Sequence, residues 1–160
     1  MGFIDTIKAR AKADKKVIVL PETEDRRTYE ATAQILKEGI ADVVLVGSEE
    51  AIKKGSEGLD ISGAKIVDPA TSEKTQGYID KLVELRSKKG MTPEQAKEIL
   101  LNQYLYYGVM MVKMGDADGM VSGACHSTAD TLRPCLQILK TKPGTKLVSA
   151  FFLMVVPHCE

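Results

Sequence analysis

The sequence has no excess of charge of either sign, because 22 Lys and Arg residues balance 22 Asp and Glu residues. A neutral chain lacks the broad positive surface that binds nucleic acid or an anionic membrane, so we expect neither partner. No apolar run approaches the roughly 20 residues that span a bilayer, and the charged start at residues 1–14 does not look like a signal peptide. Three cysteines are too few for a disulfide framework and favour the cytoplasm.

What the sequence does contain is a globular composition, with 44% hydrophobic and 28% charged residues in a chain of 160. Short apolar runs alternate with amphipathic stretches. Strands are predicted at residues 16–20, 42–47, 65–67 and 119–122, and helices at 23–38, 48–54, 71–89, 92–112 and from 127 or 128 to about 140. This alternation predicts a single α/β domain over residues 1–160, with a doubly wound, mostly parallel sheet and flanking helices in three layers.

Local signals mark several ends of the predicted helices. Ser48 is a typical N-cap, and Thr92 with Gln95 forms a capping box that opens a helix. Gly90 is a typical helix stop. Gly108 lies inside the last part of a predicted helix, where it marks either a break or a close contact.

The most apolar part of the chain is residues 146–157, near its end. Its composition predicts a buried strand. A strand at that place indicates either an architecture that continues beyond it or a C-terminal strand tucked into the sheet. If its apolar face were exposed, we would expect the chain to self-associate.

Residues 119–134 hold the most informative pattern. A short strand is followed by Gly123 and small neighbours, then by Ser127 and Thr128 at the start of a helix, with Arg133 about a turn later. Helix N-termini beyond the carboxyl ends of parallel strands bind anions, and arginine binds phosphate through two hydrogen bonds. The segment therefore predicts a phosphate site. The structural alternative is that Ser127 and Asp130 form a capping box that serves only the helix.

Other motifs are weaker. The sequence has no Gly-x-Gly-x-x-Gly and no Walker loop, so a standard dinucleotide or P-loop site is not predicted. Five residues could suggest a metal or a thiol nucleophile, but their spacing matches no zinc pattern, and we expect no metal. They are Cys125, His126, Cys135, His158 and Cys159. Arg26 and Arg27, at the turn after residues 16–20, face the same sheet edge as the predicted phosphate site.

The segment Asp118-Gly-Met-Val-Ser-Gly-Ala-Cys-His-Ser-Thr-Ala-Asp-Thr-Leu-Arg-Pro134, followed by Lys140-Thr-Lys-Pro-Gly144, closely resembles the phosphate acetyltransferases. Leu20-Pro-Glu22 and Leu85-Arg86 also match, so the resemblance covers essentially the whole chain in order. It is more distant from the related phosphate butyryltransferases. The resemblance implies one lobe of a two-domain fold, with the second domain not represented among these residues.

The resemblance also implies a function: transfer of an acetyl group between acetyl phosphate and coenzyme A. It assigns Ser127, Thr128 and Arg133 to the phosphate and Arg86 to coenzyme A, which acts as a substrate. The acid–base residues of the family lie in a later segment, so we assign no catalytic residue here. We expect small-molecule substrates and a homo-oligomer. The alternatives are a phosphate butyryltransferase, a stand-alone phosphate- or coenzyme A-binding module without catalysis, and a structural domain.

Overall fold

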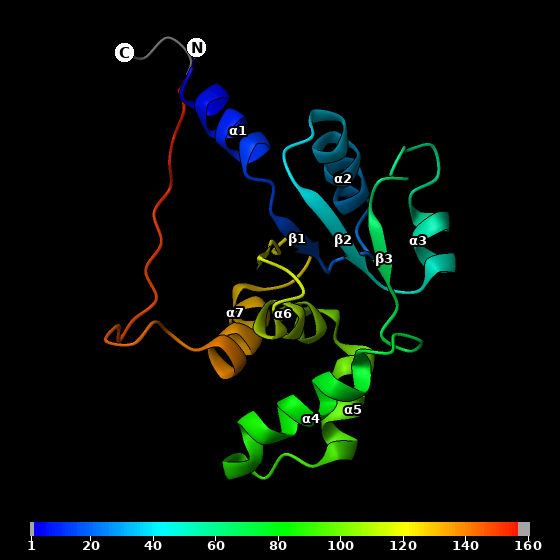
Figure 1. The fold of residues 1–160 in the computed structure, drawn as a ribbon, viewed down its shortest axis with the longest axis vertical. Coiled ribbons are helices and arrows are strands. Elements are labelled where there is room, and N and C mark those ends of the chain that lie inside the picture. The colour runs from blue at the N-terminus through cyan, green and yellow to red at the C-terminus, as the bar shows by residue number, and fades with distance from the viewer. Residues whose placement is uncertain (1, 157–160) are drawn as a thin grey trace.

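The computed structural model describes residues 2–156, and within them four parallel strands form one sheet in the order β3-β2-β1-β4 (Figure 1). The strands are β1 (Val17–Leu20), β2 (Asp42–Val46), β3 (Lys65–Val67) and β4 (Gly119–Met120). All pairs in the sheet are parallel. The four strands predicted from the sequence are therefore confirmed, although β4 is shorter than expected.

Helices cover both faces of this sheet (Figure 1). They are α1 (Phe3–Ala13), α2 (Arg26–Glu38), α3 (Glu49–Gly55), α4 (Thr75–Arg86), α5 (Pro93–Asn102), α6 (Tyr104–Met114) and α7 (Thr128–Pro134), with a 3-10 turn at Ser87–Lys89 and a π-helix at Cys135–Leu139. Helices α2 and α3 pack on one face, and α4, α5, α6 and the π-helix pack on the other. The predicted three-layer, doubly wound α/β fold is confirmed.

Strand β2 shows why the two faces hold separate cores. Its side chains alternate, because successive residues of a strand point to opposite faces. Val43 and Leu45 join the cluster under α2 and α3, whereas Val44 and Val46 join the cluster under α4, α5 and α6. All four are almost fully buried. A strand buried on both sides reads as a continuous apolar run, which is the pattern that predicted it.

The helix ends follow the local signals in the sequence. The Ser48 side chain accepts a hydrogen bond from the Ala51 backbone N–H at 3.3 Å. Thr92 and Gln95 form both hydrogen bonds of the capping box. Gly90 has a left-handed backbone with φ of 76°, as a C-terminal stop requires. These three predictions are confirmed.

The helical segment after Thr92 is divided differently from the simplest prediction. It breaks at Gln103, between α5 and α6, and Gly108 lies inside α6. A Cβ atom on Gly108 would stand 2.8 Å from Met120 Sδ and 3.2 Å from a methyl carbon of Val19. Gly108 therefore marks a close contact that lets α6 approach β1 and β4, the second of the two expectations for this residue.

The prediction of a buried strand at residues 146–157 is wrong for the part that the structure describes. Residues 146–156 form neither helix nor strand, and their side chains are exposed. A strand needs a neighbouring strand for its N–H and C=O groups, and none of the four described strands pairs with this segment. Its large exposed apolar residues are Leu147, Val148, Phe151, Phe152, Leu153, Met154, Val155 and Val156.

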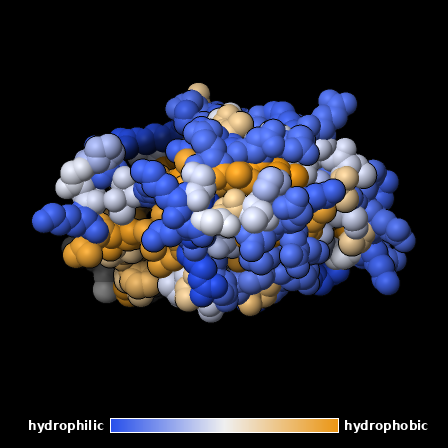
Figure 2. Space-filling model, turned by 90° about the horizontal axis from the view of Figure 1, so that it is seen from below, coloured by the Kyte–Doolittle hydropathy of each residue, from blue (hydrophilic) through white to orange (hydrophobic). Residues whose placement is uncertain are grey.

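The apolar surface of this segment lies apart from the α/β body. Figure 1 shows residues 141–156 as an extended run beside the body, and Figure 2 shows orange, hydrophobic residues on that same side of the molecule. Phe151 and Phe152 are 89% and 94% exposed. Within residues 2–156, none of the helices combines the length and the apolar character needed to cross a membrane.

We expect this chain to self-associate through residues 147–156, because burial removes apolar side chains from water and each large one contributes about 1.5–3 kcal/mol. Light scattering on a size-exclusion column should give a mass above 17.4 kDa. The double variant Phe151→Asp/Phe152→Asp should shift the protein toward monomer, and Ser149→Asp should do so less. A monodisperse wild-type monomer would contradict this expectation.

Candidate functional site

The strand order creates a crevice at one edge of the sheet. From β1 the chain runs through α2 to β2 and through α3 to β3, and it later returns to β4 on the opposite side of β1. Neighbouring parallel strands whose connections leave in opposite directions form a switch point, where ligands of open α/β sheets bind. The loops at residues 21–25 and 121–127 follow the carboxyl ends of β1 and β4 and meet there.

Glu22 connects these two loops. Its side chain is only 3% exposed. One carboxylate oxygen accepts the backbone N–H groups of Gly123 and Ala124 at 2.7 and 2.8 Å. The other accepts those of Cys125 and His126, both at 3.0 Å. Gly123 has φ of 115°, a conformation that favours glycine and starts this turn.

These hydrogen bonds decide the ionisation of Glu22. Burial alone opposes a charge on the carboxylate, but the N–H groups of Ala124, Cys125 and Gly123 and the side chain of His126 stabilise the charged form. The net effect holds the pKa of Glu22 well below its usual range. Glu22 is therefore a charged carboxylate at neutral pH, although it lies almost completely out of water.

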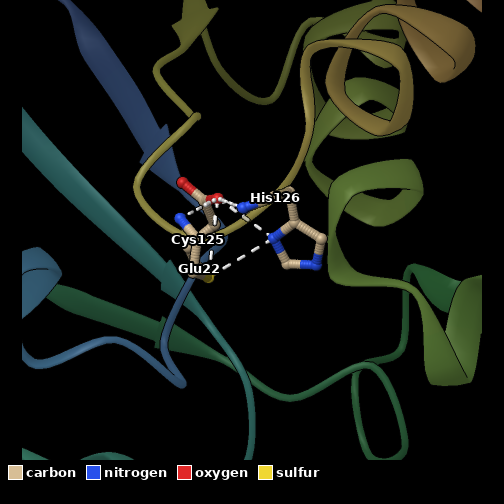
Figure 3. A group of neighbouring side chains, drawn as sticks. All are labelled: Glu22, Cys125 and His126. Carbon is tan, nitrogen blue, oxygen red and sulfur yellow. Dashed lines mark hydrogen bonds and ion pairs between the residues drawn. The ribbon is translucent and has the colours of Figure 1, made fainter.

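The His126 imidazole lies beside the carboxylate of Glu22 (Figure 3), and its other ring nitrogen lies near the carboxylate of Glu24. Its Nδ1 atom is 3.0 Å from Glu22 Oε1, and its Nε2 atom is 3.4 Å from Glu24 Oε1. Cys125 Sγ is 3.5 Å from the same Nδ1 atom. Desolvation of the sulfur and the charges of Glu24 and Glu22 raise the pKa of the Cys125 thiol to about 12. The adjacent Cys125 and His126 are thus not an activated thiol nucleophile, which needs a lowered pKa.

Glu22, Cys125 and His126 also form a group of possible metal ligands, with one donor atom each within 4.8 Å. The chemistry does not fit a metal well, because both oxygens of Glu22 already accept backbone hydrogen bonds and the Cys125 thiol stays protonated. The expectation of no metal stays a prediction. His158 and Cys159, the other sequence candidates for ligands, lie outside the described residues.

The predicted phosphate residues Ser127 and Thr128 begin α7. Ser127 Oγ accepts the backbone N–H of Asp130 at 3.2 Å and donates to Asp130 Oδ2 at 2.6 Å. Ser127 is thus the N-cap of its own helix, as the structural alternative expected, but Asp130 accepts from the Ser127 hydroxyl and not from its backbone N–H, so the capping box is incomplete. Thr128 is the first residue of α7 and is exposed to solvent.

Arg133, the third predicted phosphate residue, has a side chain that is 59% exposed and lies 3.7 Å from Asp130. It lines a cavity of about 440 Å³ at the switch point. The cavity lies between the loop after β1, the junction of α5 and α6, and the start of α7. Its lining comprises Thr23, Glu24, Ala51, Asn102, Gln103, Tyr104, Leu105, Tyr106, His126, Asp130 and Arg133. Ser127 and Thr128 are not part of this lining.

Arg86, predicted to contact coenzyme A, is the last residue of α4 and does not line this cavity. Its Nε atom is buried and has no hydrogen-bond partner. Arg86 and Arg133 both affect the phenol of Tyr106. Burial raises the pKa of Tyr106, while the charges of Arg133 and Arg86 lower it. Tyr106 donates to Gln137 Oε1 at 3.0 Å. The charges of both arginines thus act on one tyrosine of the cavity wall.

Sequence reasoning missed the central role of Glu22. The signal was an acidic residue directly after a buried strand and Pro21, in a turn already expected to face the phosphate site. Of the two arginines in that turn, Arg27 pairs with Asp25 at 2.6 Å and donates to the carbonyl oxygen of Ala124. Arg26 instead donates to backbone carbonyl groups of Gly55 and Glu57. Only Arg27 among these two therefore contacts the loop after β4.

Comparisons with known proteins agree on one family. Residues 2–160 match the model of the phosphate acetyl/butaryl transferase family. The chain is 58% identical to the phosphate acetyltransferase of Acetivibrio thermocellus and 54% identical to that of Thermoanaerobacterium thermosaccharolyticum, over 160 residues in each case. It covers 48% of the length of each. The chain thus spans about half the length of these curated relatives.

Solved structures give the same result for the fold. A phosphotransacetylase from Streptococcus pyogenes superposes with a TM-score of 0.84 at 37% identity, covering 92% of this chain and 46% of that one. The EutD phosphotransacetylase from Staphylococcus aureus gives 0.81 at 42% identity, covering 90% and 44%. The chain belongs to the phosphate acetyl/butaryl transferase family, as its resemblance implied.

Glu22→Gln should destabilise the protein by about 2 kcal/mol or more at neutral pH, because an amide replaces one charged acceptor oxygen with a donor that faces N–H groups. The pKa of Glu22 is lower in the folded state, so its charge stabilises the fold above the usual value of 4.5, and this contribution falls as pH drops below it. Urea unfolding should show a difference between wild type and variant that shrinks in acid.

The neighbouring Glu24, Asp25, Arg27 and His126 are unchanged in Glu22→Gln, so the comparison of the two proteins isolates the one carboxylate. A difference in unfolding free energy that stays constant from neutral pH to acid would contradict the assignment of a charged, buried Glu22.

Proposed function

We propose that this chain forms the phosphate-binding part of a phosphate acetyltransferase, which moves an acetyl group between acetyl phosphate and coenzyme A. The observation that carries the proposal is the position of Arg133. It lines the 440 Å³ cavity at the switch point of the sheet, in a chain of this family. A guanidinium in such a crevice matches the geometry of phosphate and neutralises its charge.

The proposed reaction sets clear demands on the site. The thiol sulfur of coenzyme A attacks the acetyl carbonyl carbon, a base takes the thiol proton, and a new C–S bond forms. The bond between that carbon and the phosphate oxygen then breaks, and phosphate leaves with the electron pair. Positive groups near the phosphate stabilise the charge that develops on it. Arg133 is proposed to do so, and no described residue is assigned as the base.

Ser127 and Thr128 are proposed as further phosphate contacts at the start of α7. Thr128 is exposed and offers its hydroxyl without losing a bond in the capping motif. Ser127 would have to exchange its 2.6 Å bond to Asp130 for one to the ligand. We therefore place Thr128 and Arg133 ahead of Ser127 in the proposed site.

Arg86 is proposed as a contact for coenzyme A, which is long and carries phosphate groups away from its thiol. The Nε atom of Arg86 is buried without a hydrogen-bond partner, and its charge lowers the pKa of Tyr106 in the cavity wall. We propose an acetyl group, because the named relatives are phosphate acetyltransferases, with a butyryl group as the alternative within the family.

The second candidate is a phosphate- or coenzyme A-binding module without catalysis, because the residues around the cavity include no assigned base. A cytoplasmic homo-oligomer accompanies both candidates. The free thiols of Cys125 and Cys135 support the location, and the exposed apolar segment at residues 147–156 supports the oligomer.

Asp130 competes with any anion at Arg133. The hydrogen bond from Ser127 and the charge of Arg133 hold the pKa of Asp130 below its usual range, so the carboxylate is charged at neutral pH. It lies 3.7 Å from Arg133 and lines the same cavity. An arriving phosphate therefore has to replace or repel this carboxylate, which predicts weak binding by the chain itself.

We expect Arg133→Ala to weaken binding of inorganic phosphate by about tenfold, the loss of one charge-assisted hydrogen bond, and Asp130→Asn to strengthen it by removing the competing charge. Isothermal titration calorimetry with phosphate, acetyl phosphate and coenzyme A measures both. Arg10→Ala, on the exposed α1, is the matched control and should bind like wild type.

Unchanged phosphate binding in Arg133→Ala, with altered stability only, would contradict the proposed site and favour a structural role. Turnover separates the remaining candidates. We expect the pure 160-residue chain not to release phosphate from acetyl phosphate in the presence of coenzyme A. Robust release would show that a base lies within this chain.

A further inference from the structure

The buried carboxylate of Glu22 has no assigned part in the reaction, because it does not line the cavity. We propose that Glu22 is a positioning residue. Its carboxylate fills the cluster of backbone N–H groups at residues 123–126 in place of an external anion. It thereby fixes His126 and the first turn of α7 against the cavity. Its effect on a ligand rests on the proposed phosphate site, whereas its effect on the loop does not.

The geometry of the cluster supports the first part. The N–H groups of four consecutive residues converge on one carboxylate, two on each oxygen, at 2.7–3.0 Å. Consecutive N–H groups that converge in this way form a concavity that favours an anion. In this protein the anion is supplied by a side chain from the neighbouring strand end. A free phosphate therefore has no access to these four donors while Glu22 is in place.

The position of His126 supports the second part. Glu22 Oε1 accepts both the backbone N–H and the Nδ1 atom of His126, each at 3.0 Å. Backbone and imidazole are thus held by the same oxygen, and the imidazole then lines the cavity. The next residue, Ser127, is the N-cap of α7. The helix that carries Arg133 therefore begins directly after His126, whose position Glu22 fixes.

A second contact holds the same loop from its other side. Arg27 pairs with Asp25 and donates to the carbonyl oxygen of Ala124. The N–H and C=O groups of Ala124 are therefore both bound to residues that follow β1. The loop after β4 is thus attached by charged groups of opposite sign to the loop after β1, through Glu22, and to the start of α2, through Arg27. Glu24 also contacts His126 Nε2 at 3.4 Å.

The test removes the Glu22 carboxylate by substitution and then supplies a small carboxylate from solution. Glu22→Ala should leave the four N–H groups without an acceptor, and amide hydrogen exchange at residues 123–126 should become roughly tenfold faster or more. Formate, the smallest carboxylate, should slow that exchange again and raise the melting temperature of Glu22→Ala in a saturable way. Chloride at the same ionic strength should do neither.

Glu49→Ala is the matched control, because it also removes one carboxylate, but from a surface ion pair with Lys53 whose side chains are about 70% exposed. Formate should not stabilise it beyond wild type. Where Glu22→Ala fails to fold even with formate, Glu22→Gln gives the same exchange measurement. In Glu22→Gln, the nitrogen NMR signal of the His126 imidazole should also change, because Nδ1 loses a charged partner.

The phosphate measurement distinguishes this inference from the proposed function. With a folded protein, Glu22→Gln should weaken phosphate binding, which the loss of a merely stabilising side chain would not do. Glu22→Ala does not serve in this measurement, because its vacated N–H cluster is open to phosphate itself. Rescue of amide exchange without phosphate binding in wild type would overturn the proposed function and keep the filled cluster. Exchange at residues 123–126 that is unchanged in both variants would overturn the inference.

Discussion

The contact between the Glu22 carboxylate and the N–H groups of residues 123–126 joins two segments about 100 residues apart in the sequence. The two segments follow β1 and β4, which pair through only two residues of β4. A short strand pair leaves the loops beyond it poorly fixed by the sheet itself. The buried hydrogen bonds to the charged Glu22 carboxylate supply the missing constraint, because hydrogen bonds to charged groups are stronger than neutral ones. Removing the carboxylate would also leave the N–H groups without an acceptor, which destabilises the fold. The geometry of the crevice depends on this contact.

The cavity beside this contact has carboxylates as well as an arginine on its wall, so it does not present a strongly positive field. Glu24 and Asp130 lie on its wall together with Arg133 and His126. Asp130 stays charged because Ser127 and Arg133 stabilise it. A ligand anion therefore gains a contact with Arg133 but is repelled by Asp130. Its binding by this chain depends on whether it displaces Asp130 from the arginine.

The sequence predicted the fold well where one periodicity dominated. Strand β2, buried on both faces, could only be read as a parallel strand, and Ser48, Thr92 and Gln95 marked helix starts through bonds within a few residues. The apolar run at 146–156 was misjudged, because composition shows that a segment favours burial but not what it would pair with.

The site was predicted only in part for a similar reason. Arg133 lines the cavity, while its role toward phosphate stays a prediction. The N-cap bond of Ser127 could be predicted because it joins residues close in sequence. The role of Glu22 depends on amides about 100 positions away. Nothing in one sequence pairs an acid after β1 with the loop after β4. The order of the strands, which brings them together, comes only from the structure.

A titration of the isotope-labelled chain with inorganic phosphate tests the central claim most directly. The claim is that Glu22 occupies the backbone N–H cluster and that an external anion binds through side chains of the cavity. Nuclear magnetic resonance should then show phosphate-dependent shifts at the side-chain nitrogen of Arg133 and the imidazole of His126, while the amides of residues 123–125 move little. Large, saturable shifts at those amides, with little change at Arg133, would contradict it.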